Sequence, residues 1–137
     1  MAVYVDDMHR SPLGRFRGMK MCHMIAENET ELHLMADRIG VERRWYQGDH
    51  YDLPVAKRSL AVRRGAVQIT MRELAALAFL HRIGRPMGEP ATAVDRMRAW
   101  KRAQLTPEER AQRDAFRAQF NRLVTYGSRQ TLSLTRF

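Results

Sequence analysis

The pattern of apolar and polar residues predicts a small sheet in the first half of the chain. Residues 2–5 and 19–26 are largely apolar runs of strand length, and the second is typical of a buried strand. A third short strand is predicted within residues 41–47. Residues 67–69 alternate between apolar and polar side chains, which indicates a fourth strand.

Signals for helix starts separate and follow these strands. Capping side chains, or a proline suited to a first turn, predict helices beginning near Asn28, Pro54, Thr70, Thr92 and Thr106. The last start is the clearest, because Thr106 precedes a proline and two acids. The order β-β-α-β-α-β, followed by helices, predicts an α/β (α+β) fold. We expect a small mixed sheet of about four strands covered by helices, with a C-terminal helical extension.

Glycine and proline mark a division late in the chain. They occupy every second position from Gly84 to Pro90 and predict a linker there. We therefore expect a small α/β domain at residues 1–85. A basic helical extension, packed on that domain, is expected at residues 86–137.

The uneven distribution of charge indicates the class of partner. Residues 1–70 carry 11 Lys and Arg against 9 Asp and Glu, whereas residues 71–137 carry 13 against 6, and the net charge is +9. A basic half predicts a polyanionic partner such as nucleic acid. The residues expected to contact its phosphates are Arg98, Lys101, Arg102, Arg110, Arg113 and Arg117. A solvated, arginine-rich surface is the alternative.

The aromatic residues of the basic half allow another kind of partner. Trp100, Phe116 and Phe120 would suit a protein partner of a phage or bacterial regulator, and an exposed stripe on the last helix would equally suit a homodimer. Packing of these aromatic residues against the core is the alternative that we favour.

The compartment is predicted from what the chain lacks. No apolar run approaches the roughly 20 residues of a membrane helix, so no membrane contact is expected. Cys22 is the only cysteine, which excludes an internal disulfide and favours a cytoplasmic, reducing compartment. Because it lies in an apolar run, Cys22 is expected to be a small buried residue.

Polar chemistry is concentrated in the segment from His50 to Arg58. Asp52 is expected to cap a helix, which would place Lys57 and Arg58 near free N–H groups that attract a phosphate or carboxylate. His50 is a candidate general base and Tyr51 a candidate donor. In the alternative interpretation Asp52 only caps the helix, and the two cations are solvated.

Two aspartates and two further histidines complete the candidate site. Asp6 and Asp7 end the first strand, where carboxylates often hold Mg²⁺ or Mn²⁺ together with substrate phosphates. His23 lies among apolar residues, which also suits a hydrogen-bonded core histidine. His33 has Asp37 one turn later to orient its ring, although a surface ion pair is the alternative.

These residues predict binding, and metal-dependent hydrolysis, of a phosphorylated ligand such as a nucleotide. The expected catalytic residues are Asp7, His50 and Asp52. The expected ligand-binding residues are Tyr51, Lys57, Arg58, His23 and His33. Asp6 and Asp7 are expected to hold Mg²⁺ or Mn²⁺. The chain lacks the zinc-protease, phosphate-loop and serine-hydrolase motifs. Binding of nucleic acid or protein by the basic helices is the alternative function.

Seven short blocks in the first half occur in an order that resembles an uncharacterised bacterial and phage family, domain of unknown function 4031. The blocks are Val3-Tyr4-Val5-Asp6-Asp7, Cys22-His23-Met24-Ile25-Ala26, Glu31-Leu32-His33, Ile39-Gly40-Val41, His50-Tyr51-Asp52, Lys57-Arg58 and Gly65-Ala66-Val67. The resemblance covers about residues 1–70. It implies a shared fold there and no activity, and the basic half looks like an extension beyond the family's domain.

Overall fold

The structure is a computed structural model that describes residues 2–134, with side chains described to residue 126. The chain divides into two compact units, Met1–Met97 and Arg98–Phe137. Within residues 2–134, no helix is both long and apolar enough to span a membrane.

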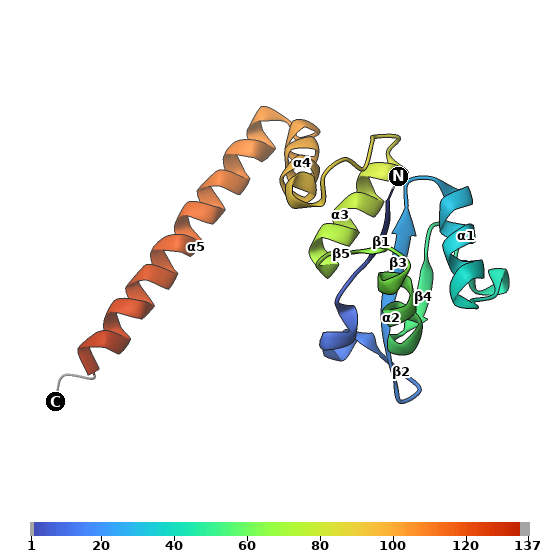
Figure 1. Cartoon of the computed structure of the whole chain (residues 1–137). Coiled ribbons are helices and arrows are strands. Elements are labelled where there is room, and N and C mark those ends of the chain that lie inside the picture. Colours follow the sequence, from blue (N-terminus) through green and yellow to red (C-terminus); the bar gives the residue numbers. More distant parts are fainter. Residues whose placement is uncertain (1, 135–137) are drawn as a thin grey trace. The chain divides into compact units, whose positions relative to one another are not determined.

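A mixed five-stranded sheet is the centre of the first unit (Figure 1). Its strands are β1 (Val3–Val5), β2 (Arg15–Phe16), β3 (Met19–Ala26), β4 (Tyr51–Pro54) and β5 (Val67–Gln68). The long strand β3 pairs antiparallel with β1, β2 and β4, whereas β1 and β5 are parallel. The mixed sheet is therefore confirmed. It contains one more strand than expected, because β2 is too short to show a periodic pattern.

Residues 2–134 contain five α-helices. They are α1 (Glu29–Ile39), α2 (Val55–Arg63), α3 (Met71–Arg82), α4 (Pro90–Ala103) and α5 (Pro107–Leu134). The Asn28 side chain caps α1 by accepting from the Glu31 amide, and Gly40 ends it with φ of 74°. Thr70 and Glu73 form a reciprocal capping box at α3. The predicted helix starts at Asn28 and Thr70 are confirmed.

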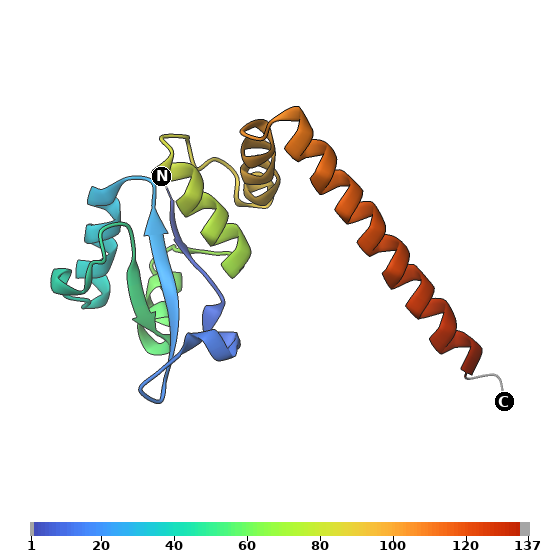
Figure 2. The same cartoon turned by 180° about the vertical axis from the view of Figure 1, so that it is seen from behind.

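The alternation along β3 separates two apolar cores on opposite faces of the sheet. Cys22 and Met24 pack in the core that α1 and α2 cover, whereas Ile25 belongs to the core beneath α3. Figures 1 and 2 show α1 and α3 on opposite sides of β3. Cys22 is fully buried, as predicted, and burial raises the pKa of its thiol to about 12.

The segment from residue 41 to residue 58 differs most from the prediction. Residues 43–45 form a short 3-10 helix, and the strand lies later, at Tyr51–Pro54. The predicted N-cap role of Asp52 is therefore wrong. Pro54 occupies the N-cap position of α2 without a side-chain cap, and Asp52 lies within β4. Its β-sheet pairing with β3 prevails over the local helix-start signal.

The first unit continues past the predicted linker. Met87 and Ala93 are buried in the core beneath α3, and α4 begins at Pro90 rather than near Thr92. Proline fits the first helical turn because it has no N–H to satisfy. The domain boundary at residue 85 stays a prediction.

The second unit contains the end of α4 and the long helix α5. Thr106 starts α5 as predicted: its hydroxyl accepts from the Glu109 amide at 3.2 Å, and the Glu109 carboxylate accepts from the Thr106 amide at 2.8 Å. Phe116 and Phe120 are 71% and 56% exposed, and their packing against the core of the first unit stays a prediction.

Replacing Gly14 by alanine should reduce the free energy of unfolding by about 1–3 kcal/mol. Gly14 is buried in the loop before β2, and an added Cβ would lie 2.8 Å from the Met21 carbonyl oxygen and even closer to that of Met8. Backbone atoms cannot move aside as a flexible side chain can. Urea denaturation measures the change. Leu13→Ala, at a 74% exposed neighbour, should stay within about 0.5 kcal/mol of wild type. Equal urea midpoints for wild type and Gly14→Ala would contradict the prediction.

Candidate functional site

Strand pairing brings two polar side chains together on the sheet. His23 of β3 lies directly opposite Asp52 of β4 in the antiparallel register. By the alternation of each strand, both point to the face that carries α3. The α3 core begins at Ile25, so His23 and Asp52 lie beyond its apolar cover.

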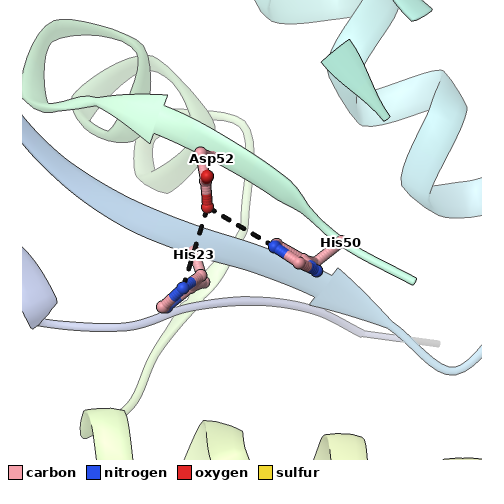
Figure 3. Close-up of side chains that lie close together, drawn as sticks. All are labelled: His23, His50 and Asp52. Atoms are coloured by element: carbon pink, nitrogen blue, oxygen red, sulfur yellow. Dashed lines mark ion pairs between the residues drawn. The ribbon is translucent and has the colours of Figure 1, made fainter. Parts of the chain in front are cut away.

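His50 joins this pair from the residues that precede β4 (Figure 3). Its Nε2 lies 3.5 Å from Asp52 Oδ1, and His23 Nε2 lies 3.7 Å from the same oxygen. One ligand atom from each residue falls within 4.8 Å of the other two. Around a tetrahedral zinc ion, ligand atoms at about 2.0–2.1 Å from the metal are about 3.3 Å apart. The two distances to Asp52 Oδ1 are slightly longer, so the three ligand atoms would have to move closer together to hold such an ion.

Both imidazole rings are oriented by a second carboxylate. His23 Nδ1 lies 2.8 Å from Asp6 Oδ2, and His50 Nδ1 lies 2.5 Å from Asp49 Oδ1. Because an ionised carboxylate only accepts hydrogen bonds, each neutral ring carries its proton on Nδ1. The Nε2 atom then presents a lone pair toward Asp52. Paired carboxylates of this kind orient metal-binding histidines in proteins.

Asp52 supplies an oxygen whose hydrogen bonding is incomplete. Its Oδ2 accepts from Gln47 Nε2 at 2.6 Å, whereas Oδ1 is shielded from solvent and has no hydrogen-bond partner. Burying a carboxylate oxygen without a partner is costly. A cation between this oxygen and the two Nε2 atoms would remove that cost.

The charged groups around His23 favour a positive charge between His23, His50 and Asp52. The pKa of His23 is raised, chiefly because its ring is hydrogen-bonded to Asp6. Burial acts in the opposite direction, and the negative charges of Asp6, Asp52 and Asp49 add to the increase. The cluster therefore attracts either a proton or a metal cation.

In metal-free protein, His23 should stabilise the fold at low pH and lose that effect as pH rises. Its folded pKa exceeds the unfolded value of 6.5, so its contribution is fully present below that value and disappears as pH passes the raised folded pKa. Urea denaturation across this range measures the effect. The difference in unfolding free energy between wild type and His23→Gln should shrink with rising pH. A constant difference would count against the raised pKa.

A groove of about 640 Å³ adjoins the cluster, and His23 and Asp52 form part of its wall. Most of its other lining residues are apolar. They are Met8, Leu13, Gly14, Phe16, Met19, Met21, Gly40, Val41, Trp45 and Pro54. The polar and charged remainder is Arg15, Glu42, Gln47 and Lys57. The volume lies in the range of small-molecule sites, which is about 300–1,000 Å³.

The structure places two predicted ligand-binding residues away from this groove. Tyr51 points to the opposite face of β4, where its hydroxyl lies 2.6 Å from His33 Nδ1. His33 Nε2 lies 3.2 Å from a Glu29 oxygen. The predicted pairing of His33 with Asp37 is wrong, since Asp37 accepts from Arg43 at 3.3 Å.

The two predicted cations also separate. Lys57 lines the groove, and its Nζ donates to the Ile39 carbonyl at the end of α1 at 2.9 Å. Arg58 is buried and donates to the Asp6 carbonyl at 2.8 Å and to Gln68 Oε1 at 3.2 Å. Arg58 therefore joins α2 to the ends of β1 and β5 and does not line the groove.

Asp6 and Asp7 make unrelated contacts. The buried Asp6 carboxylate accepts from the His23 amide at 2.8 Å as well as contacting its ring. Asp7 accepts from the Met71 amide at 2.8 Å, at the first residue of α3. Asp6 thus belongs to the site as the partner of His23. The direct metal roles of Asp6 and Asp7 stay predictions.

The basic residues of the second half differ in their surroundings. Arg102 forms a two-bond ion pair with Asp114 at 2.8 Å, and Arg110 donates to the Leu105 carbonyl at 3.0 Å. Arg98, Arg113 and Arg117 are exposed. Lys101 also makes an interaction within the protein. Their binding to nucleic acid stays a prediction.

Sequence reasoning missed two residues that support the site. Asp49 orients His50, and Gln47 holds the second oxygen of Asp52. The adjacency of Asp49 and His50 was a visible signal for the first pair. No sequence signal identified Gln47, because its contact depends on how the chain turns into β4.

A family model described as "Protein of unknown function (DUF4031)" matches residues 3–82. The match contains His23, His50 and Asp52, and it ends at the last residue of α3. No curated protein and no solved structure matches the chain.

Proposed function

The chain belongs to the DUF4031 family, whose description assigns no activity, so we propose a function from the site itself. The protein binds one divalent transition-metal ion between His23, His50 and Asp52. It uses this ion to bind and hydrolyse a phosphorylated small molecule in the adjoining groove.

One observation carries the proposal: two Nε2 lone pairs and a buried, unpartnered carboxylate oxygen converge on one point. In a purely structural cluster, Asp52 Oδ1 would be expected to accept a hydrogen bond at normal distance. The distances of 3.5 and 3.7 Å to the histidine nitrogens are too long for that.

The donor set favours a particular class of metal. Imidazole nitrogen suits zinc, iron and other transition ions, whereas Mg²⁺ prefers oxygen ligands and retains its water. Two imidazoles and one carboxylate therefore favour Zn²⁺ or Mn²⁺ over Mg²⁺. Of the two ions expected from the sequence this keeps Mn²⁺, and it adds Zn²⁺.

The chemistry follows from the number of protein ligands. Three ligands leave a coordination position for water or a ligand oxygen, as in catalytic zinc sites. A metal ion lowers the pKa of bound water to about 7 and neutralises charge on a phosphoryl oxygen. In the proposed reaction water attacks phosphorus, the ester P–O bond breaks, and the alcohol leaves with a proton. Lys57 supplies a positive charge at the groove wall.

The decisive experiment is a metal titration of the full chain after treatment with a chelator. Isothermal titration calorimetry with Zn²⁺ or Mn²⁺ should give one equivalent per chain. An ion at 100 times its dissociation constant should stabilise the fold by about 2.7 kcal/mol, measurable as a shift in Tm. Hydrolysis of 4-nitrophenyl phosphate should require the same ion.

Variants separate the site from adventitious binding. His50→Ala and Asp52→Asn should each lose the titration and the shift in Tm. His81→Ala removes an exposed histidine of α3 and should titrate as wild type does. Equal metal binding by wild type, His50→Ala and Asp52→Asn would overturn the metal proposal. Metal binding without any metal-dependent hydrolysis would overturn only the catalytic part.

A further inference from the structure

We infer that the ligand of this groove is a sugar phosphate ester that carries an aromatic base, of nucleoside monophosphate type, with its base against Trp45 and Phe16 and its phosphate at the metal cluster. This inference rests on the proposed function, since it names the class of molecule that the same site takes.

Exposed apolar residues are concentrated at this groove. Among described residues of the first unit, six large hydrophobic side chains are exposed, and four of them line the groove. Those four are Leu13, Phe16, Met19 and Trp45, with exposures of 74%, 55%, 46% and 58%. Exposed apolar residues gathered at one cavity mark a binding surface better than scattered ones do.

The two exposed aromatic rings are arranged in a similar way. The Arg44 guanidinium lies 5.1 Å from the ring centroid of Trp45, and the Arg17 guanidinium lies 5.2 Å from that of Phe16. A cation over a ring is an attractive contact that restrains the side chain. Restrained, exposed aromatic rings are suitable stacking surfaces for a nucleobase.

The charged groups around these rings favour an anionic ligand. Arg15 and Lys57 line the groove together with Glu42 and Asp52, and the charge of Glu42 is offset by Arg44, which pairs with it at 3.0 Å. A bound metal ion would add further positive charge beside Asp52. A ligand with an aromatic body and a phosphate therefore matches both the apolar wall and the charges.

The hairpin turn that follows Phe16 fixes the position of this residue beside the groove. Arg17 and Gly18 form the two-residue turn between β2 and β3, with φ of 49° and 77°. Positive φ at both central residues is typical of a tight hairpin turn. This turn places Phe16 opposite Met19, so both flank the same side of the groove.

The test compares three related molecules on the full, metal-loaded chain, with each phosphate ester supplied as its hydrolysis-resistant phosphonate isostere. Adenosine monophosphate contains both ring and phosphate, ribose 5-phosphate lacks the ring, and adenosine lacks the phosphate. Calorimetry should show adenosine monophosphate binding at least about tenfold more tightly than either fragment, because base stacking and phosphate contacts both contribute. Equal affinity for adenosine monophosphate and ribose 5-phosphate would overturn the inference.

A matched pair of variants locates the ring. Trp45→Ala should reduce the affinity for adenosine monophosphate to within a few-fold of that for ribose 5-phosphate. Leu34→Ala removes an exposed apolar side chain outside the groove and should leave both affinities unchanged. Unchanged nucleotide binding by Trp45→Ala would overturn the inference, and so would loss of binding in Leu34→Ala as well.

The failure of this inference is distinguishable from the failure of the proposed function. The metal titration needs no nucleotide. If one metal ion binds per chain but adenosine monophosphate and ribose 5-phosphate bind equally tightly, only the inferred class of ligand is refuted. If no metal binds, the proposed function fails. The three molecules and Trp45→Ala then still decide whether the groove takes a phosphate ester that carries an aromatic base. A second copy of the chain that binds in the groove and is not displaced by adenosine monophosphate would also refute the inference.

Discussion

Asp6→Asn should weaken metal binding by about 10–100-fold while the protein stays folded. The Asn oxygen can still accept from the His23 amide, as Asp6 Oδ1 does at 2.8 Å. The new NH₂ group would replace Oδ2 and donate to His23 Nδ1. The ring would then carry its proton on Nε2, the atom that faces Asp52, and could not coordinate a metal without losing that proton.

Calorimetric titration with Zn²⁺ measures this effect, and far-UV circular dichroism verifies the fold. Asp37→Asn is the matched control, because Asp37 is an acid of α1 that pairs with Arg43 at the surface. Asp49→Asn should act on His50 in the same direction as Asp6→Asn acts on His23. If Asp6→Asn bound Zn²⁺ as tightly as wild type does, the position of the proton on the His23 ring would not depend on Asp6 in a way that matters for metal binding.

Arg58→Leu should reduce the free energy of unfolding by about 3–5 kcal/mol. The buried guanidinium donates to the Asp6 carbonyl and to Gln68, so its removal leaves a carbonyl at the end of β1 without this donor. It also detaches α2 from the ends of β1 and β5. Leucine fills part of the space but cannot replace either hydrogen bond.

Urea denaturation measures this loss as a lower midpoint concentration of urea. The slope of the unfolding free energy against urea concentration should stay unchanged. Arg63→Leu is the control on the same helix, because Arg63 is exposed, and its effect should stay within about 0.5 kcal/mol. A loss below about 1 kcal/mol for Arg58→Leu would mean that water or a neighbouring group satisfies the Asp6 carbonyl as well as Arg58 does.

Features that depend on local signals were predictable from the sequence. The largely apolar strand β3, the Asn28 cap, and the Thr70 and Thr106 helix starts were all identified correctly. Each depends on residues within a few positions of one another, so the sequence pattern carries the information directly.

The composition of the site was only partly predictable, because it depends on strand pairing. His23, His50 and Asp52 were each identified as candidates, but their assembly requires the register that sets His23 opposite Asp52. The segment after His50 contains a helix-start signal and a strand at the same time. Pairing with β3 selects the strand, which no local pattern reveals.

Alternation explains why Tyr51 was wrongly grouped with its neighbours. A helix start would have placed Tyr51 and Asp52 near one another at the helix end, whereas a strand sends them to opposite faces. Tyr51 is completely buried beside His33, and Asp52 faces the groove. The contacts of Arg58 with Asp6 and Gln68 span 52 and 10 residues of sequence, and helix periodicity does not specify them.

Because side chains alternate between the two faces of β3, the cluster of His23, His50 and Asp52 forms only when the strands pair in the native register. A shift of one residue between β3 and its neighbours would turn His23 into the apolar core and expose the Cys22 thiol. Assembly of the proposed metal ligands and burial of the Cys22 thiol are thus two consequences of one pairing register. A chain trapped in a shifted register would lack the cluster and carry a reactive cysteine, so metal capture would draw the refolding population toward the native pairing.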